Sequence, residues 1–156
     1  MDISILNKEN NVRLNIRVAG LIVNDNKVLL QTCDNVDFYS LPGGRVKYME
    51  DTLCAIKREL KEEIGIDFLD SDIELLDMIE NFFEFNNSKY HEFLFVYKIS
   101  NCKEISRLDN FKTLDKSDSY NSWHSLDDIE NIDIKPAVLK KVMKNDRLGH
   151  NIIHEI

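Results

Sequence analysis

Three glutamates, Glu59, Glu62 and Glu63, stand at positions i, i+3 and i+4 of one segment. If the segment is helical, this spacing places the three side chains on one side of the helix, where like charges repel by roughly a few tenths of a kcal/mol per pair. A hard divalent cation such as Mg²⁺ offsets this repulsion, because it binds carboxylate oxygens together with phosphate oxygens and water. Taken alone, the trio also fits an ordinary solvated, glutamate-rich helix. The spacing therefore raises the hypothesis of a site that handles phosphate through bound cations.

The residues around the trio have helical periodicity from about Asp51 to Ile64. Asp51 or Thr52 can serve as the N-cap, and Gly65 can end the helix. The apolar positions of the segment fall within an arc of roughly 80°, and the glutamates are centred roughly 110° away from that arc. We therefore expect one face of the helix to pack on the core and a neighbouring face to carry the carboxylates.

A longer pattern surrounds the trio, and it can be written G-x5-E-x7-R-E-U-x-E-E-x-G-U, where U is aliphatic. Its positions are filled by Gly44, Glu50, Arg58, Glu59, Leu60, Glu62, Glu63, Gly65 and Ile66. The segment resembles the Nudix box, and the chain is similar to MutT-like Nudix hydrolases over residues 12–145. The resemblance includes the hairpin before the box, the Leu41–Gly44 approach and the stretch from Trp123 to Pro136.

The resemblance implies a chemical reaction and a set of metal ligands. Nudix enzymes hydrolyse a nucleoside diphosphate linked to another moiety, by attack of a metal-activated water on phosphorus. The implied ligands of Mg²⁺ or Mn²⁺ are Glu59, Glu62, Glu63 and a backbone carbonyl near Gly43 or Gly44. Metal ions suit this role because they neutralise the pyrophosphate charge, lower the pKa of bound water and align the reacting groups.

Arg58, Glu62 and Glu63 are the residues we expect to take part in catalysis. Arg58 would pair with carboxylates of the box, because its planar guanidinium suits bidentate contacts. Glu50 would stabilise the loop that leads into the helix. The general base is either a box glutamate, Glu63 or Glu62, or an acidic residue on a later loop. The candidates on that loop are Asp115 and Asp118.

A binding module and a calcium-binding or structural protein are the alternatives to an enzyme. A Nudix-fold module that binds a nucleotide without cleaving it usually has eroded box carboxylates, and none is eroded here. A calcium-binding or structural protein is disfavoured because the segment lacks a looped cage of oxygen ligands. The intact box therefore favours a nucleotide pyrophosphohydrolase.

The substrate contacts are indicated less directly than the metal ligands. Arg17, near the centre of a strand, could reach a phosphate. Four aromatic residues could stack on a base, namely Phe82, Phe83, Phe85 and Tyr90, and of these we select Phe82 and Tyr90 as substrate contacts. Alternating aromatic residues on a hairpin also fit a hydrophobic core. The proline that many ADP-ribose hydrolases carry after the box is absent, as is the tyrosine typical of dinucleoside polyphosphate hydrolases, which favours a nucleoside triphosphate or a related small nucleotide.

The rest of the chain predicts strands, one long helix, more strands and short helices. The expected strands are Val12–Val23, Val28–Thr32, Phe38–Leu41, Ile73–Phe85 and Tyr90–Ile99. Pro42-Gly43-Gly44 should break regular structure, and Cys102–Asn121 should form an irregular, mobile loop. Short helices are expected at Leu126–Glu130 and from Pro136 to about Lys144. This order predicts an α/β fold, the α/β/α sandwich of the Nudix type with a mixed central sheet.

Composition and charge limit the class of protein and the partners that it can bind. The 156 residues carry 20 basic and 28 acidic side chains, a net charge of −8. We expect a single domain over residues 1–156, with no membrane anchor and no nucleic-acid polymer as partner, because such binding depends on Lys and Arg. Three scattered cysteines indicate a reducing cytoplasm. The expected partner is a small nucleotide, and the resemblance also allows a homodimer.

Overall fold

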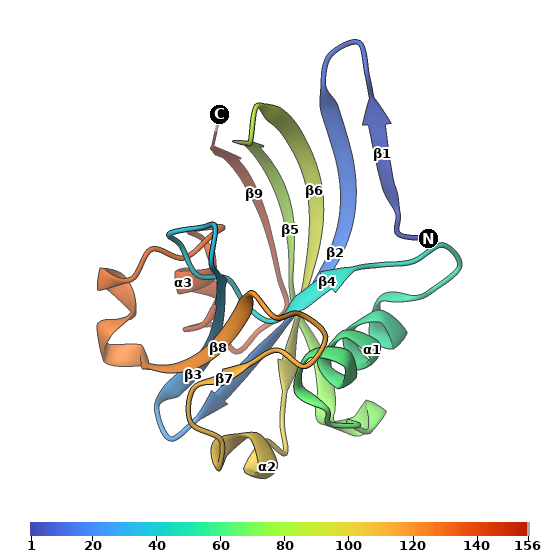
Figure 1. Cartoon of the computed structure of the whole chain (residues 1–156). Helices are drawn as coiled ribbons and strands as arrows, with labels where there is room; N and C mark the ends of the chain where they lie inside the picture. The colour runs from blue at the N-terminus through green and yellow to red at the C-terminus, as the bar shows by residue number, and fades with distance from the viewer. Residues whose placement is uncertain (156) are drawn as a thin grey trace.

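The computed structural model describes residues 1–155, which form one nine-stranded sheet with helices on both faces (Figure 1). The strands are β1 (Ser4–Asn7), β2 (Val12–Asn24), β3 (Lys27–Cys33), β4 (Gly43–Arg45), β5 (Ile73–Phe85), β6 (Ser88–Ile99), β7 (Phe111–Lys112), β8 (Ser119–Ser125) and β9 (Gly149–Glu155). The helices are α1 (Thr52–Ile64), α2 (Lys103–Ser106), α3 (Leu139–Val142) and the 3₁₀ helices η1 (Asp70–Asp72) and η2 (Leu126–Asn131). Among these helices, none is both long enough and apolar enough to span a bilayer.

Strand β2 connects the two parts of the sheet. Along residues 12–22 it pairs in parallel with β6, whereas its last two residues pair with β3. The strand order is β7-β8-β3-β2-β6-β5-β9, and β1 and β4 also pair with β2. In Figure 1, strands β3, β7 and β8 diverge from β5, β6 and β9. The short strand β4 lies against β2 at this divergence and places Arg45 opposite Arg17.

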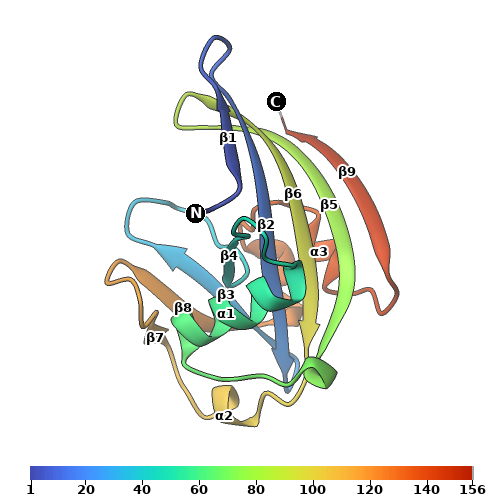
Figure 2. The same cartoon turned by 90° about the vertical axis from the view of Figure 1, so that its right-hand side faces the viewer.

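Helices cover the sheet on both sides, which confirms the predicted α/β sandwich around a mixed sheet. Figure 2 shows α1 in front of the sheet and α3 behind it. Successive side chains of a strand point to opposite faces, and β2 accordingly contributes Val18 and Ile22 to the core under α1. Its Ala19 and Leu21 belong to the second core, together with Leu139 and Val142 of the α3 segment.

Helix α1 begins and ends where the sequence predicts. Asp51 is the N-cap, and its Oδ1 accepts a hydrogen bond of 2.8 Å from the Cys54 amide. Gly65 ends the helix with φ of 83°, a left-handed conformation that favours glycine. Between these caps, Ile56, Leu60 and Ile64 pack into the core. The helix is therefore fixed at both ends and along one face, which holds its glutamates in place.

Five strands were not predicted from the sequence, namely β1, β4, β7, β8 and β9. The first and the last of them show why. β1 has four residues, and β9 is an edge strand in which Ile152 and both histidines are exposed. Both depend on pairing with distant residues, β1 with β2 and β9 with β5. A short run of half-exposed residues gives little local signal, because such strands are stabilised by their neighbours.

Three further expectations about local structure were wrong. Phe38–Leu41 is not a strand and forms only isolated bridges from Tyr39 and Ser40. Gly43 and Gly44 lie inside β4 rather than in a break. The segment Cys102–Asn121 contains α2, β7 and the start of β8 instead of being wholly irregular. Strands β4 and β7 come from pairing with β2 and β8, which the local residues do not encode.

The helix expected from Pro136 to about Lys144 is shorter than predicted. Only Leu139–Val142 is α-helical. Leu139 donates to the Pro136 carbonyl and Asn145 to the Val142 carbonyl, so three-residue spacing closes both ends. Such tighter turns commonly replace α-helical hydrogen bonds at helix ends, which leaves a single α-turn here.

Leu60→Ala tests the core that positions the glutamates. Leu60 is fully buried between α1 and the sheet, and truncating such a side chain typically costs about 2–5 kcal/mol of unfolding free energy. Urea unfolding followed by circular dichroism measures the loss. Leu69→Ala, at a side chain that is 67% exposed, is the control and should change stability little. Equal losses in the two variants would contradict the packing described.

Candidate active site

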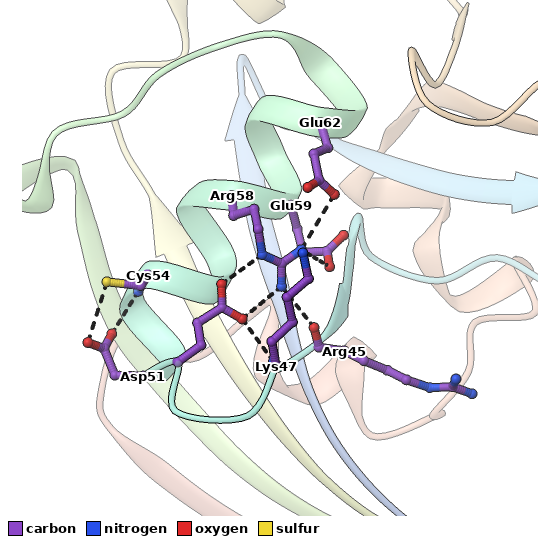
Figure 3. A network of polar contacts seen from close by, with 8 residues as sticks. Arg45, Lys47, Asp51, Cys54, Arg58, Glu59 and Glu62 are labelled. Atoms are coloured by element: carbon purple, nitrogen blue, oxygen red, sulfur yellow. Dashed lines mark hydrogen bonds and ion pairs between the residues drawn. The ribbon is translucent and has the colours of Figure 1, made fainter. Parts of the chain in front are cut away.

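Arg58 connects the loop before α1 to the carboxylates on the helix (Figure 3). Its Nε and Nη2 donate to the two oxygens of Glu50, at 2.7 and 2.8 Å. Its Nη1 donates to Glu59 at 2.7 Å and, more weakly, to Glu62 at 3.4 Å. Nη2 also donates to the Arg45 carbonyl at 3.0 Å. One guanidinium thus fixes the loop, the end of β4 and two of the three glutamates relative to one another.

Glu50 anchors this arrangement from the loop side. Its Oε2 also accepts from the Lys47 backbone amide at 2.9 Å, which closes the loop on itself. The hydrogen bonds from Arg58 hold the pKa of the Glu50 carboxyl below its usual range, and the Lys47 amide adds to this effect. Glu50 therefore closes the loop before α1 through the Lys47 amide and joins that loop to Arg58.

Glu63 is completely buried, and its two oxygens have different surroundings. Oε2 accepts from the Gly43 amide and from the Gln31 side chain, each at 3.2 Å. Oε1 has no hydrogen-bond partner, and the Lys116 ammonium lies 3.9 Å from it. Burial raises the pKa of Glu63 to about 7, against a lowering by Lys116. A buried carboxylate oxygen without a partner is costly, so Oε1 is suited to an additional ligand.

Gly44 leaves room for the Glu59 carboxylate. A Cβ atom at this position would overlap all three atoms of that carboxylate group. The close approach of the β4 backbone to Glu59 therefore requires glycine. This contact places the Glu59 oxygens beside the Gly43-Gly44 backbone, which the resemblance to the Nudix box had implied as a metal-binding position.

A polar cavity of about 390 Å³ opens where β4 meets α1. It is lined by Glu59, Glu62, Gly43, Gly44, Asp115 and Lys116, among others. Of the two loop aspartates predicted as alternative bases, Asp115 lines this cavity. Asp118 does not, and its carbonyl accepts a hydrogen bond from the Asp34 amide instead.

The site has hard oxygen donors that fit Mg²⁺ or Mn²⁺. Arg58 takes one oxygen of Glu59 and one of Glu62, so each of these carboxylates retains a second oxygen for an ion. Glu63 contributes the unpartnered Oε1. Within residues 1–155, no three acidic, His or Cys side chains are already gathered in the geometry of a metal site. Glu59, Glu62 and Glu63 are therefore the residues that would hold an ion, each through an oxygen that Arg58 does not occupy.

A second cavity of about 610 Å³ adjoins the first, and Arg17 and Arg45 line both. Phe83 and Tyr90 line the larger cavity, with their rings stacked at 4.8 Å and an interplanar angle of 5°. Of the predicted substrate contacts, Arg17 and Tyr90 therefore lie at a cavity. Phe82 does not line either cavity.

Phe82 points to the opposite face of the sheet from Phe83, as neighbouring strand residues must. There its ring stacks on His91 at 4.2 Å and on His154 at 4.6 Å. Of the four aromatic candidates, Phe83, Phe85 and Tyr90 line the larger cavity, whereas Phe82 does not. The local sequence does not distinguish the adjacent phenylalanines, because it does not assign the faces of the hairpin.

Several residues that line a cavity or contact Glu63 were not identified from the sequence. Gln31 and Lys116 contact Glu63, and Asn81 and Glu92 are buried at the larger cavity. Gln31 had a local signal, because it directly follows the apolar run Val28–Leu30 in β3. Asn81 and Glu92 had little, because their strands contain several other polar residues. Lys116 belongs to a polar loop, where a lysine carries no such signal.

A layered α/β sandwich, with a glutamate-bearing helix facing a glycine-containing strand, is an arrangement that this chain shares with known proteins. The family model described as the NUDIX domain matches residues 13–145. The chain belongs to the Nudix hydrolase family, which confirms the resemblance noted in the sequence.

Similar proteins agree with this assignment. An 8-oxo-dGTP diphosphatase of Buchnera aphidicola is 36% identical over 56 residues, which cover 33% of this chain and 43% of the relative. A MutT protein from Bacillus halodurans has a similar structure, with a TM-score of 0.66 and 22% identity over 90% of this chain and 89% of that one. An ADP-ribose pyrophosphatase from Streptococcus suis has a TM-score of 0.56 and 14% identity, covering 89% of this chain and 98% of that one. The two structural relatives support the fold.

Glu50→Gln tests the network around Arg58. Loss of the charge weakens two short hydrogen bonds between side chains that are only 15–20% exposed, and we expect a loss of about 1–3 kcal/mol in unfolding free energy at pH 7. Asp70→Asn is the control, since the Lys57–Asp70 ion pair is also 2.7 Å long but lies on the surface. This control should show no measurable change.

The effect of Glu50→Gln should also depend on pH. The pKa of Glu50 is lower in the folded than in the unfolded protein, so its stabilisation is present above the unfolded pKa and is lost as pH falls through the folded pKa. The difference between wild type and variant should therefore shrink as pH falls below about 4.3. Urea unfolding from pH 7 to pH 3 measures it, and a constant difference would contradict the proposed ion pair.

Proposed function

We propose that this protein hydrolyses a pyrophosphate linkage in a small nucleotide, in a reaction that depends on Mg²⁺ and that Mn²⁺ can support. The observation that carries the proposal is the buried, unpartnered Oε1 of Glu63 next to the cavity lined by Glu59 and Glu62. A phosphate chain is itself anionic, so these carboxylates can serve it only through cations. The 8-oxo-dGTP diphosphatase relative supports a nucleoside triphosphate as the first substrate to test.

The arrangement of the two cavities supports a nucleotide in particular. The larger cavity has stacked aromatic side chains, which suit a base, and the smaller one has the carboxylates. Arg17 and Arg45 stand between them, opposite each other on β2 and β4. Guanidinium groups recognise phosphate oxygens well. A nucleotide would thus place its base near Tyr90 and its phosphates near Arg17 and Arg45.

The box residues at the smaller cavity then have defined tasks. Glu59 and Glu62 line the cavity and hold the cations together with Glu63, which is not a lining residue but accepts a hydrogen bond from the lining residue Gly43. Gly43 or Gly44 offers a backbone carbonyl. Bound Mg²⁺ would neutralise the pyrophosphate and favour ionisation of water. Arg58 keeps Glu59 and Glu62 oriented. These are the residues assigned from the box.

The attacking water must lose its proton to a nearby base as the new bond to phosphorus forms and the anhydride P–O bond breaks. Glu63 or Glu62 is the proposed base, and Asp115 is the alternative on the loop, since it lines the same cavity. Asp118 is less suited, because it is not among the lining residues.

We further propose that residues 1–156 act as one domain and that the protein works in the cytoplasm. Cys33, Cys54 and Cys102 are free thiols, which fits a reducing compartment. The proposed partner is a small nucleotide, and we propose neither a nucleic-acid polymer nor a membrane as a partner. The resemblance also allows a homodimer, which light scattering would detect as twice the molar mass of one chain.

A substrate panel tests the activity directly. Nucleoside triphosphates, oxidised deoxynucleoside triphosphates, ADP-ribose, nucleotide sugars and dinucleoside polyphosphates are incubated with Mg²⁺, with Mn²⁺ or with EDTA, and products are identified by ³¹P NMR. We expect metal-dependent cleavage of at least one class and none in EDTA. A well-folded protein that cleaves nothing on the panel would overturn the proposal and favour a binding module.

Isosteric variants separate the proposed roles. Glu62→Gln and Glu63→Gln should each lower kcat by about 100-fold or more, because removal of a group that stabilises the transition state typically costs 2.7 kcal/mol or more. Asp115→Asn should lower kcat by less than about 10-fold if a box glutamate is the base. The reverse pattern would assign the base to Asp115. Unchanged turnover in all three variants would contradict the site.

A further inference from the structure

Three polar side chains form a row across the central strands at the larger cavity. Asn15 of β2 stands opposite Glu92 of β6, and Glu92 stands opposite Asn81 of β5. All three line the cavity, although they are only 2%, 5% and 3% exposed, respectively. Buried polar groups are normally paired within the protein. Such a row at the wall of a cavity is therefore suited to a polar ligand.

The row has hydrogen-bond acceptors that the protein does not use. Asn81 Oδ1 is buried without any partner. Glu92 has no Lys or Arg within ion-pair distance among residues 1–155. Burial raises the pKa of Glu92, while the Arg17 charge and a hydrogen bond from Asn15 lower it. Asn15 Oδ1 is already occupied by the Ser4 hydroxyl at 2.8 Å. The acceptors left for a ligand are thus Glu92 and Asn81, on adjacent strands.

Arg17 adds a donor beside the row, on β2 two residues from Asn15 and opposite Leu94 of β6. Its Nε is buried without a hydrogen-bond partner. The neighbouring strands β2, β6 and β5 therefore carry a donor and two acceptors, with Arg17 displaced by two residues from the register of Glu92 and Asn81. The remaining nitrogens of the same guanidinium can still face the phosphates.

The walls of the cavity suit a flat ring. Phe83 and Tyr90 are stacked with nearly parallel rings, and Phe38 meets Phe85 edge to face, with centroids 6.2 Å apart. All four residues line the cavity with the polar row. Proteins read an unstacked base in this manner, by aromatic or apolar contacts with its faces and hydrogen bonds to its Watson–Crick edge.

We propose that Glu92 and Asn81 select guanine, by accepting hydrogen bonds from its N1–H and its exocyclic N2 amino group. This inference rests on the proposed function, since it places the base of the nucleotide in the larger cavity. Guanine presents a carbonyl oxygen and then two adjacent donors, which complements Arg17, Glu92 and Asn81 in order.

The other common bases do not match two adjacent acceptors. Adenine and cytosine place a ring-nitrogen acceptor next to their amino group, and uracil and thymine place their single N–H between two carbonyl oxygens. In each case an acceptor of the base would face Glu92 or Asn81. Opposed acceptors and unpaired buried groups are an effective means of rejecting a wrong ligand. Glu92 and Asn81 would thus determine specificity without touching the reacting phosphorus.

Binding of nucleoside monophosphates tests the inference separately from hydrolysis, because these ligands have no anhydride to cleave. GMP, IMP, AMP, CMP and UMP are titrated into the full-length protein by calorimetry in the presence of EDTA. We expect GMP to bind at least about 10-fold more tightly than AMP, CMP or UMP. IMP, which lacks the N2 amino group but keeps N1–H, should bind with intermediate affinity. Equal affinities, or a preference for AMP, would overturn the proposal without any variant.

Glu92→Gln identifies the residue responsible. The amide replaces one acceptor oxygen by a donor, so GMP affinity should fall by about 10-fold or more while AMP affinity changes less than about 3-fold. Glu74→Gln, at an exposed site on β5, is the matched control and should leave both unchanged. A parallel loss for GMP and AMP would indicate a merely structural role for Glu92 and contradict the inference. Selective GMP binding with no hydrolysis on the panel would leave this inference standing and reject the proposed function alone.

Discussion

The close contact between the β4 backbone and the glutamate face of α1 is the constraint on which the rest of the site depends. Glu59 can lie against Gly44 only because that residue has no side chain. Glu63 reaches the Gly43 amide from the same helix. Both contacts place carboxylates of like charge together, which is unfavourable unless cations balance them. Arg58 offsets part of the negative charge of Glu59 and Glu62. Oε1 of Glu63 has no hydrogen-bond partner, so its charge is not fully offset within the protein.

The sheet turns this local constraint into a site with two compartments. Strand β2 pairs with β6 along most of its length and with β3 only at its end, and β4 is held at the point of divergence. One compartment has carboxylates, the other has aromatic rings and buried amides, and Arg17 and Arg45 line both. The division matches the two ends of a nucleotide. It also explains why a protein with a net charge of −8 can serve an anionic substrate, since positive charge is needed only at the junction and at the bound ions.

The sequence predicted those parts of the molecule that have strong local signals. Helix α1, its caps at Asp51 and Gly65, and the long hairpin of β5 and β6 follow from periodicity and turn residues, and the box located the glutamates. Strands β1, β4, β7, β8 and β9 were missed because most of them are short and all of them exist through pairing with another strand. Phe82 was preferred to Phe83 because a shift of one residue exchanges the two faces of a strand. Glu92 and Asn81 carried little signal, because their strands contain several other polar residues, and only the strand register shows that the two are neighbours.

Titration of the protein with Mn²⁺, followed by electron paramagnetic resonance of the free ion, tests the central claim most directly. Wild type should bind Mn²⁺, and Glu63→Gln should weaken that binding by about 10-fold or more, as expected on loss of one charged ligand. Glu104→Gln, at an exposed glutamate of α2 that lies outside the box and lines neither cavity, should bind as wild type does. Equal Mn²⁺ affinity in wild type and Glu63→Gln, or no binding by wild type, would show that the three glutamates are not gathered to hold cations.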